Sequence, residues 1–298
     1  MPPSRTDRMR GRARPRVAAA LAPCVLSLGA LCAAPGVAAA APDPAFALFD
    51  PAKFTRSTVI DNPYFPLAPR TQFILEGRSD RGEGRRRHRV VFTVTDLTKV
   101  IDGVRTVVMW DRDINAGKLL EEELAFMAQD DAGTVWNFGE YPEERENGRP
   151  TGAPDTWIVG RARARAGIHM HASPQLGSPS YYHGWAPAIE FFDRAKVYRM
   201  GRRTCVPAGC FDNALITDEW NPTERGAHER KYYAPGFGNV RVGFASGRER
   251  ESLVLRKVRR LGAREAARVS RRALTLDRRA YRIAPRVYGR TPRAQRAS

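Results

Sequence analysis

The sequence predicts a mainly all-β protein, in which about ten strands form an antiparallel meander that makes a curled sheet or an open barrel. Short segments of alternating apolar and polar residues follow one another between residues 71 and 258, which is typical of half-buried strands. Turns that contain Gly, Asn, Asp or Pro separate them, and no long helical pattern lies between them. Parallel strands would need long crossover connections, so we expect antiparallel neighbours. A sheet of this many strands tends to curl or to close.

The first five predicted strands follow a Pro-rich, irregular lead-in over residues 43–70. A charged turn at 78–87 ends the first strand, and Asp102-Gly103 turns the second strand into the third. Asn115-Ala116-Gly117 and Asp130-Asp131-Ala132-Gly133 have the residue types of the next two turns. The strands predicted between these turns are 71–77, 90–98, 104–113, 119–128 and 134–140.

The second half of the meander follows a Gly- and Pro-rich loop over residues 142–187. Its clearest alternation places Val240, Val242 and Phe244 on one face of a strand, because successive side chains in a strand point to opposite faces. Residues 234–238 make a Gly- and Pro-bearing turn before that strand. The strands predicted in this half are 191–203, 211–220, 228–233, 239–246 and 251–258.

The beginning of the chain is typical of a secretory signal peptide. Residues 1–40 start with six arginines and continue into an uncharged, Ala- and Leu-rich stretch that ends in small residues, which predicts cleavage after Ala40. The uncharged stretch is also long enough to span a bilayer, so a retained membrane anchor is the alternative. We therefore expect an extracytoplasmic protein, either secreted or held in the periplasm or cell envelope.

The end of the chain differs in composition from the predicted β domain, which covers residues 41–258. The formal net charge is +18, yet residues 41–255 contain equal numbers of acidic and basic side chains. The excess lies in the leader and in a basic C-terminal tail, residues 259–298, for which we expect a helix over 264–281 and disorder in the last ten residues. This distribution argues against specific nucleic-acid binding. It is consistent with contact between the tail and an anionic envelope surface, or with a solvated extension.

Two cysteines, Cys205 and Cys210, remain after the predicted cleavage, and they bracket a Pro-Ala-Gly turn. In an oxidising compartment such a pair predicts a disulfide. Half of a metal site is the alternative, but the sequence offers no second cysteine or Cys/His pair to complete it.

Four motifs resemble those of a group of uncharacterised secreted bacterial proteins, related to exported domains with a curled antiparallel sheet such as periplasmic lipoprotein carriers use. The resemblance implies that fold for about residues 45–255 and implies no reaction. Arg70 departs from it, because the group usually has Gly there, and so do Cys205 and Cys210. The motifs are Asn62-Pro63-Tyr64-Phe65-Pro66-Leu67, the segment from Ala128 to Glu140, Pro207-Ala208-Gly209-x-Phe211 and Tyr232-Tyr233-Ala234-Pro235-Gly236-x-Gly238.

Three of the five histidines, His169, His171 and His183, lie close together in the sequence, with Glu190 beyond them. In an extended segment residues i and i+2 face the same side, so His169 and His171 are placed to share one ion. Imidazole and carboxylate ligands suit zinc or copper. A polar loop surface with unremarkable histidines is the alternative.

Three aromatic residues of the 142–187 loop, Tyr181, Tyr182 and Trp185, are the candidate ligand-binding residues. They can cover the open mouth of a curled sheet, where an apolar ligand would bind. The alternative is that they only fill the core.

The sequence contains no nucleophile elbow and no phosphate-binding glycine loop, so no catalytic residue and no cofactor is assigned. The leading hypothesis is therefore a non-enzymatic binding or carrier domain for an apolar or amphipathic ligand. The alternatives are an extracytoplasmic metal-dependent enzyme that uses the three histidines, and a structural envelope protein docked through its tail.

Overall fold

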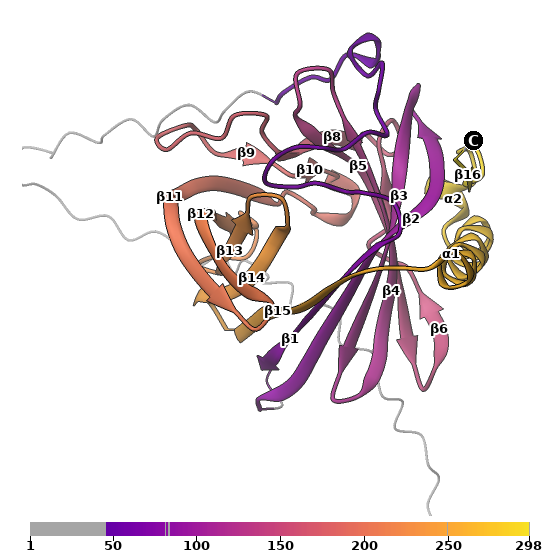
Figure 1. The fold of residues 1–298 in the computed structure, drawn as a ribbon. Helices are drawn as coiled ribbons and strands as arrows, with labels where there is room; N and C mark the ends of the chain where they lie inside the picture. The colour runs from indigo at the N-terminus through magenta and orange to yellow at the C-terminus, as the bar shows by residue number, and fades with distance from the viewer. Residues whose placement is uncertain (1–45, 81, 83, 249, 298) are drawn as a thin grey trace, which may run out of the picture. The chain divides into compact units, whose positions relative to one another are not determined.

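The computed structural model describes residues 46–80, 82, 84–248 and 250–297, and the predicted signal peptide lies outside these residues. The described part contains sixteen strands of one sheet, two α-helices and two short 3-10 helices (Figure 1). The ten longer strands are β1 (Thr71–Asp80), β2 (Arg86–Ile101), β3 (Val104–Asn115), β4 (Lys118–Gln129), β5 (Val135–Glu146), β11 (Arg194–Val206), β12 (Gly209–Trp220), β13 (His228–Ala234), β14 (Gly238–Ser246) and β15 (Arg250–Arg260).

These ten strands confirm the predicted meander, because each overlaps one predicted strand and neighbouring strands pair antiparallel. Most of the remaining strands lie in the 142–187 segment, which we expected to be a loop. They are β6 (Arg149–Gly152), β7 (Trp157–Ile158), β8 (Arg165–Met170), β9 (Tyr181–Tyr182), β10 (Gly184–Trp185) and, in the C-terminal region, β16 (Gln295–Arg296). Five of these six strands have two to four residues, too few for a period of two residues to stand out in the sequence, and β8 has six.

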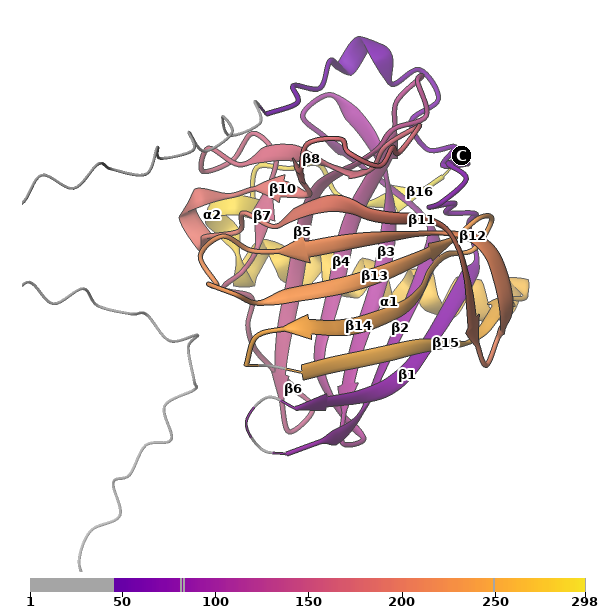
Figure 2. The same cartoon turned by 90° about the vertical axis from the view of Figure 1, so that its left-hand side faces the viewer.

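The sheet is open and strongly curled. Its strands follow the order β10-β8-β5-β4-β3-β2-β1-β15-β14-β13-β12-β11-β9, while β6 and β7 also pair with β5 and β16 pairs with β2. The curl brings β11–β15 round to face β2–β5, and the two groups of strands cross at a steep angle (Figure 2). The face between the two groups is the concave face, and the opposite face of β2–β5 is the convex face.

Each face of the sheet has its own apolar core, as β4 illustrates. Leu124 and Phe126 pack on the convex face, whereas Ala125 and Met127 pack on the concave face. The Pro-rich lead-in contributes to both cores, with Phe54 on the convex face and other residues on the concave face. The sheet is therefore buried on both sides along much of β2–β5.

The convex face is covered by α1 (Ala263–Ile283), which packs on β2 and β4 and is followed by α2 (Pro285–Tyr288) (Figure 1). The predicted helix over 264–281 is present. The end of the chain differs from the expected disorder: β16 pairs with Leu97 and Thr98 of β2, and Thr291 and Ala294 are buried. A hydrogen bond from the buried Lys99 Nζ to the carbonyl oxygen of Pro292, 2.5 Å away, also holds this segment, and composition alone does not reveal it.

The strand order begins with β10 and ends with β9, and these two strands are neighbours in the sequence. β9 pairs with β11 and β10 pairs with β8, and a single residue, His183, connects β9 to β10. The N–H of His183 donates a hydrogen bond to the carbonyl of Asp193, 2.8 Å away. His183 is thereby placed where the two edges of the curled sheet approach each other.

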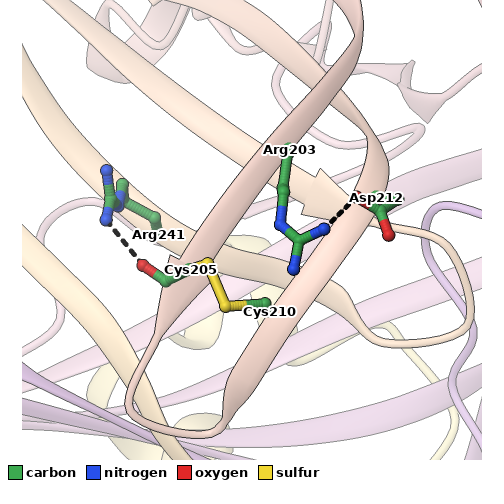
Figure 3. Close-up of a disulfide and its surroundings, with 5 residues drawn as sticks. All are labelled: Arg203, Cys205, Cys210, Asp212 and Arg241. Carbon is green, nitrogen blue, oxygen red and sulfur yellow. Dashed lines mark hydrogen bonds and ion pairs between the residues drawn. A yellow bond between two sulfur atoms is a disulfide. The ribbon is translucent and has the colours of Figure 1, made fainter.

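The predicted disulfide joins Cys205 and Cys210 across the β11–β12 hairpin (Figure 3). The two residues are register partners, and their Cα atoms are 4.0 Å apart. Arg241 of β14 donates to the carbonyl oxygen of Cys205 at 2.9 Å, so the hairpin is also tied to a third strand. The described residues include no helix with the length and apolarity that a membrane crossing requires.

Candidate functional site

The predicted aromatic residues lie near the edge of the sheet. Tyr182 stacks on Phe46 with ring centroids 4.4 Å apart, and Trp185 meets the same ring edge-on at 5.4 Å. Tyr181 and Tyr182 line a cavity of about 470 Å³ together with Phe46 and His171. Trp185 does not line it. The structure therefore places Tyr182 and Trp185 against Phe46, whereas the Tyr181 ring packs against His171 and His183, with centroids 4.4 and 5.7 Å apart.

The three predicted metal ligands lie near one another but do not form a metal-ligating group among the described residues. The rings of His169 and His183 stack with centroids 5.1 Å apart, whereas the ring of His171 packs edge-on against Tyr181 at 4.4 Å. β8 ends at Met170, so the strand alternation that would align His171 with His169 stops before His171. Glu190 is exposed at the end of a short 3-10 helix. Among the residues that the structure describes, no group of three or more His, Cys, Asp or Glu side chains is placed to hold a metal ion.

A different pocket lies on the concave face, between the two facing halves of the sheet, and we call it the concave pocket. Its volume is about 260 Å³, slightly below the range of roughly 300–1,000 Å³ that is typical of ligand cavities. Its apolar walls come from the lead-in and from both halves of the sheet. They include Phe65, Leu67, Phe73, Phe92, Met109, Met127, Val242 and Leu253.

The polar lining of the concave pocket begins with carboxylates on three adjacent strands. Asp111 of β3 is the register partner of Glu123 of β4, so their side chains leave the same face of the sheet side by side. Glu140 of β5 joins them because of a β-bulge: Phe138 and Gly139 together oppose Phe126, since the β4–β5 register shifts between Ala125 and Met127. The extra residue turns Glu140 toward the concave face.

Gly139 is required at this bulge. Its φ is +142°, and a Cβ atom there would lie 2.6 Å from the carbonyl oxygen of Trp157 in β7. The bulge also provides partners for Glu140, which accepts hydrogen bonds from Asn137 Nδ2 at 2.6 Å and from Trp157 Nε1 at 3.1 Å. The glycine therefore allows β7 to approach and Glu140 to point inward.

The three carboxyl groups have raised pKa values. Burial is the main cause for each, and the charges of Glu140 and Glu121 add to it for the pKa of Asp111. Asp111 Oδ1 is buried and has no hydrogen-bond partner among the described residues. A buried acceptor without a donor is rare in folded proteins and calls for an explanation.

A second polar group lies beside the concave pocket, where Lys231 and Tyr233 of β13 line the pocket and contact Glu219 of β12. Glu219 binds Lys231 Nζ at 2.7 Å and accepts hydrogen bonds from Thr217 Oγ1 at 2.7 Å and Tyr233 Oη at 3.1 Å. Burial alone would raise the pKa of Glu219, but Lys231 and these donors lower it to about 2. Burial lowers the pKa of His169 to about 3. Glu219 is therefore charged and His169 neutral at neutral pH.

His88 of β2 lies on the concave face and contacts acids of β3 and β15. Its Nε2 is 2.8 Å from Asp113 Oδ1 on β3, and its Nδ1 is 2.6 Å from Glu251 Oε1 on β15. Burial opposes the charged form, but the two carboxylates raise the pKa of His88 to about 9. The imidazolium therefore links three strands at neutral pH.

Most residues of the concave pocket were not candidates from the sequence. Alternation within the predicted strand 119–128 does not tell which of its faces a second layer of the sheet will cover, so Glu123 did not stand out. Two signals were present: Glu123 alternates with Leu124 and Phe126, and Gly139 interrupts β5. These residues form a site because the curl of the sheet brings β11–β15 over β2–β5, and neither signal predicts that curl.

No protein-family model and no curated protein matches the chain. Among solved structures, the chain is similar to a Bacteroides fragilis protein described as exported, with a YmcC-like fold, at 16% identity and a TM-score of 0.38. It is also similar to a protein from Parabacteroides distasonis described as a lipoprotein, at 12% identity and a TM-score of 0.37. Each comparison covers 66% of this chain and 98% of the other.

Proposed function

We propose that this chain is a non-enzymatic, extracytoplasmic binding or carrier domain that holds an apolar or amphipathic molecule in the concave pocket. The observation that carries the proposal is the pocket itself: about 260 Å³ with apolar walls and carboxylates. Such a lining suits a ligand with a hydrocarbon part and a polar part. The arginine-rich leader and the disulfide support an extracytoplasmic location.

A fluorescence titration with the neutral probe N-phenyl-1-naphthylamine tests this proposal. Ala125 lines the pocket from β4 and is 3% exposed, so Ala125→Phe fills the cavity. Val242→Phe fills it from β14, in case the first variant folds poorly. Ala245→Phe adds the same ring at an exposed position of β14 and is the matched control.

We expect the wild type and Ala245→Phe to bind one probe molecule, and the two filled variants to lose binding by about tenfold or more. Circular dichroism and thermal unfolding establish that each variant is folded. Mass spectrometry of a solvent extract of the natively purified protein then identifies what occupies the pocket. Equal probe binding by wild type and both folded, filled variants would overturn the proposal.

The outer face of α1 favours a second function, attachment to an anionic membrane surface. Six arginines of α1 lie exposed on one side of the helix, and we call them the arginine stripe. Helical geometry places them within about a third of the circumference and along about 27 Å. They are Arg264, Arg268, Arg271, Arg272, Arg278 and Arg282.

The acids of α1 do not neutralise the arginine stripe. Asp277 is buried against Lys99, and Glu265 is bound to Arg259 at 2.5 Å. Arginine at a lipid surface contributes roughly 1 kcal/mol per residue through attraction to anionic headgroups. The stripe therefore suits adsorption onto such a surface without insertion.

Vesicle flotation tests this second function. We expect the protein to float with vesicles that contain a quarter phosphatidylglycerol at 50 mM salt, and to be released at 300 mM. Replacing Arg264, Arg268 and Arg271 by Gln should weaken binding by about tenfold or more. The control replaces three exposed arginines elsewhere, Arg202, Arg203 and Arg248, and an equal loss in the control would mean that net charge and not the stripe is responsible.

A further inference from the structure

The charges that line the concave pocket are unbalanced. Lys231 is the one ammonium group in the lining, and it is already bound to Glu219 at 2.7 Å. Burial keeps His169 neutral, because its pKa is lowered to about 3. The carboxyl groups of the lining outnumber these bases; they are Asp111, Glu123, Glu140, Glu229 and Glu251.

Two of these carboxylates, Glu251 and Glu140, have ion-pair or hydrogen-bond partners in the protein, whereas one oxygen of Asp111 has none among the described residues. Glu251 is bound to His88, and Glu140 accepts hydrogen bonds from Asn137 and Trp157. Asp111 Oδ1, in contrast, is buried without any hydrogen-bond donor among the described residues. A donor is therefore missing at Asp111, beside its register partner Glu123.

The pairing of Asp111 with Glu123 is unfavourable in the empty pocket. Like charges directly opposite each other on neighbouring strands destabilise a sheet, and burial strengthens their repulsion because the interior screens charge poorly. A cation between the two carboxylates would remove this repulsion and supply the missing donor. Positions that cost stability in the free protein are commonly binding sites.

The apolar walls indicate what kind of cation fits. Phe65, Phe73, Phe92 and Met109 line the pocket that the carboxylates share. A metal ion would leave these walls without a contact, whereas an alkyl or aryl group would bury apolar surface against them. The aromatic rings also attract a cation that approaches their faces.

We propose that the concave pocket selects amphipathic organic cations, whose ammonium or amidinium group donates to Asp111 and neutralises Asp111 and Glu123 while the hydrocarbon part contacts the aromatic walls. This proposal rests on the proposed binding function and adds the substrate class. It predicts discrimination by charge among ligands with the same hydrocarbon chain.

Competition titrations of the full mature chain test the proposal. Decylammonium and decyl sulfate, each below its micelle concentration, are titrated against bound N-phenyl-1-naphthylamine at pH 7. We expect decylammonium to displace the probe at a concentration at least about tenfold lower than decyl sulfate, which corresponds to about 1.4 kcal/mol. The preference should shrink as salt is added, because screening weakens the attraction.

The double variant Asp111→Asn/Glu123→Gln should abolish the preference, because neither side chain then carries a charge that attracts a cation. Glu144→Gln/Glu146→Gln makes the same change in net charge at exposed positions of β5. This control should keep the wild-type preference.

The outcomes separate the two proposals. Equal or tighter binding of decyl sulfate, or an unchanged preference in Asp111→Asn/Glu123→Gln, overturns the cation selectivity and leaves the binding function standing. Failure of the wild type to bind the neutral probe and both amphiphiles overturns the binding function itself.

Discussion

Lys99 of β2 and Asp277 of α1 form an ion pair in which Nζ and Oδ1 are 3.0 Å apart and both side chains are almost completely excluded from solvent. Lys99 Nζ also donates to Tyr281 Oη at 3.0 Å and lies 4.2 Å from the centre of the Tyr288 ring. Asp277 accepts a hydrogen bond from Tyr288 Oη at 2.6 Å. Helix α1 is thereby fixed to the convex face through polar contacts inside an apolar layer.

The first prediction concerns this ion pair. Lys99→Met leaves Asp277 buried without its cation, so we expect the free energy of unfolding to fall by about 3–5 kcal/mol. Urea unfolding measures the loss, and limited trypsin digestion reports whether the arginines of α1 become cleavable. Adding Asp277→Leu should restore much of the stability, because no charge is then buried. If the double variant were as unstable as Lys99→Met, packing and not charge would explain the loss.

The second prediction concerns the carboxylates of the concave pocket. Their folded-state pKa values lie above the ordinary values of 3.8 for Asp111 and 4.5 for Glu123, so the charged forms lower stability once the pH rises above the ordinary values. Asp111→Asn/Glu123→Gln should therefore raise the free energy of unfolding at pH 7 by roughly 1–3 kcal/mol.

The gain should depend on pH. It should be small near pH 4, where the wild-type carboxyl groups are protonated, and it should grow as the pH rises. Thermal unfolding between pH 4 and 8 measures it, with Glu144→Gln/Glu146→Gln as the control. A variant less stable than the wild type at pH 7 would show that the two carboxylates do not repel in the folded protein.

The third prediction concerns His88. Its pKa is raised from 6.5 to about 9, so its contribution to stability is complete below pH 6.5 and is lost as the pH rises through about 9. The difference in melting temperature between the wild type and His88→Gln should be largest near pH 6 and smallest near pH 10. A difference that does not change with pH would mean that the imidazole acts only by packing.

The fourth prediction concerns Gly139. Its Cβ would meet backbone of β7, which cannot move aside as a flexible side chain can, and its positive φ is strained for other residues. Gly139→Ala should therefore lower the free energy of unfolding by roughly 1–3 kcal/mol. Gly152→Ala is the matched control, because a Cβ there meets nothing closer than 3.9 Å. Equal unfolding midpoints for the two variants would contradict the assigned role of the bulge.

The sequence predicted the long strands well because their signal is local. Alternation such as Val240, Val242 and Phe244 reports one strand and needs no partner to be recognised. The disulfide of Cys205 and Cys210 was equally accessible, since five residues of sequence separation and a turn bring the two together.

The candidate site was much less predictable because its parts come from distant segments. Asp111 and Glu123 became pocket residues only when β11–β15 curled over them, and Glu140 turned inward through a bulge that strand alternation does not reveal. The predicted aromatic site involved Tyr181 and Tyr182, which line the cavity beside Phe46. Contacts between segments far apart in the sequence therefore determine which residues line the pocket, and local sequence patterns do not reveal those contacts.

The expected disorder of the last ten residues was wrong for the same reason. Composition also did not reveal that Arg279 binds Glu143, a fully buried acid, with donor–acceptor distances of 2.9 and 2.7 Å. A charge that is paired inside the protein cannot be distinguished by composition from one that faces water.

The connection of β9 to β10 through His183 also affects how the sheet meets other molecules. A free edge strand exposes a row of unpaired backbone groups on which another chain can add a strand. Here the strand order ends in β9 and β10, which have two residues each. The strand β6, which pairs with β5, has four residues. Among the described residues, β9 covers the outer side of β11 only at Arg194 and Ala195, so the rest of this 13-residue strand is the edge on which another chain could add a strand.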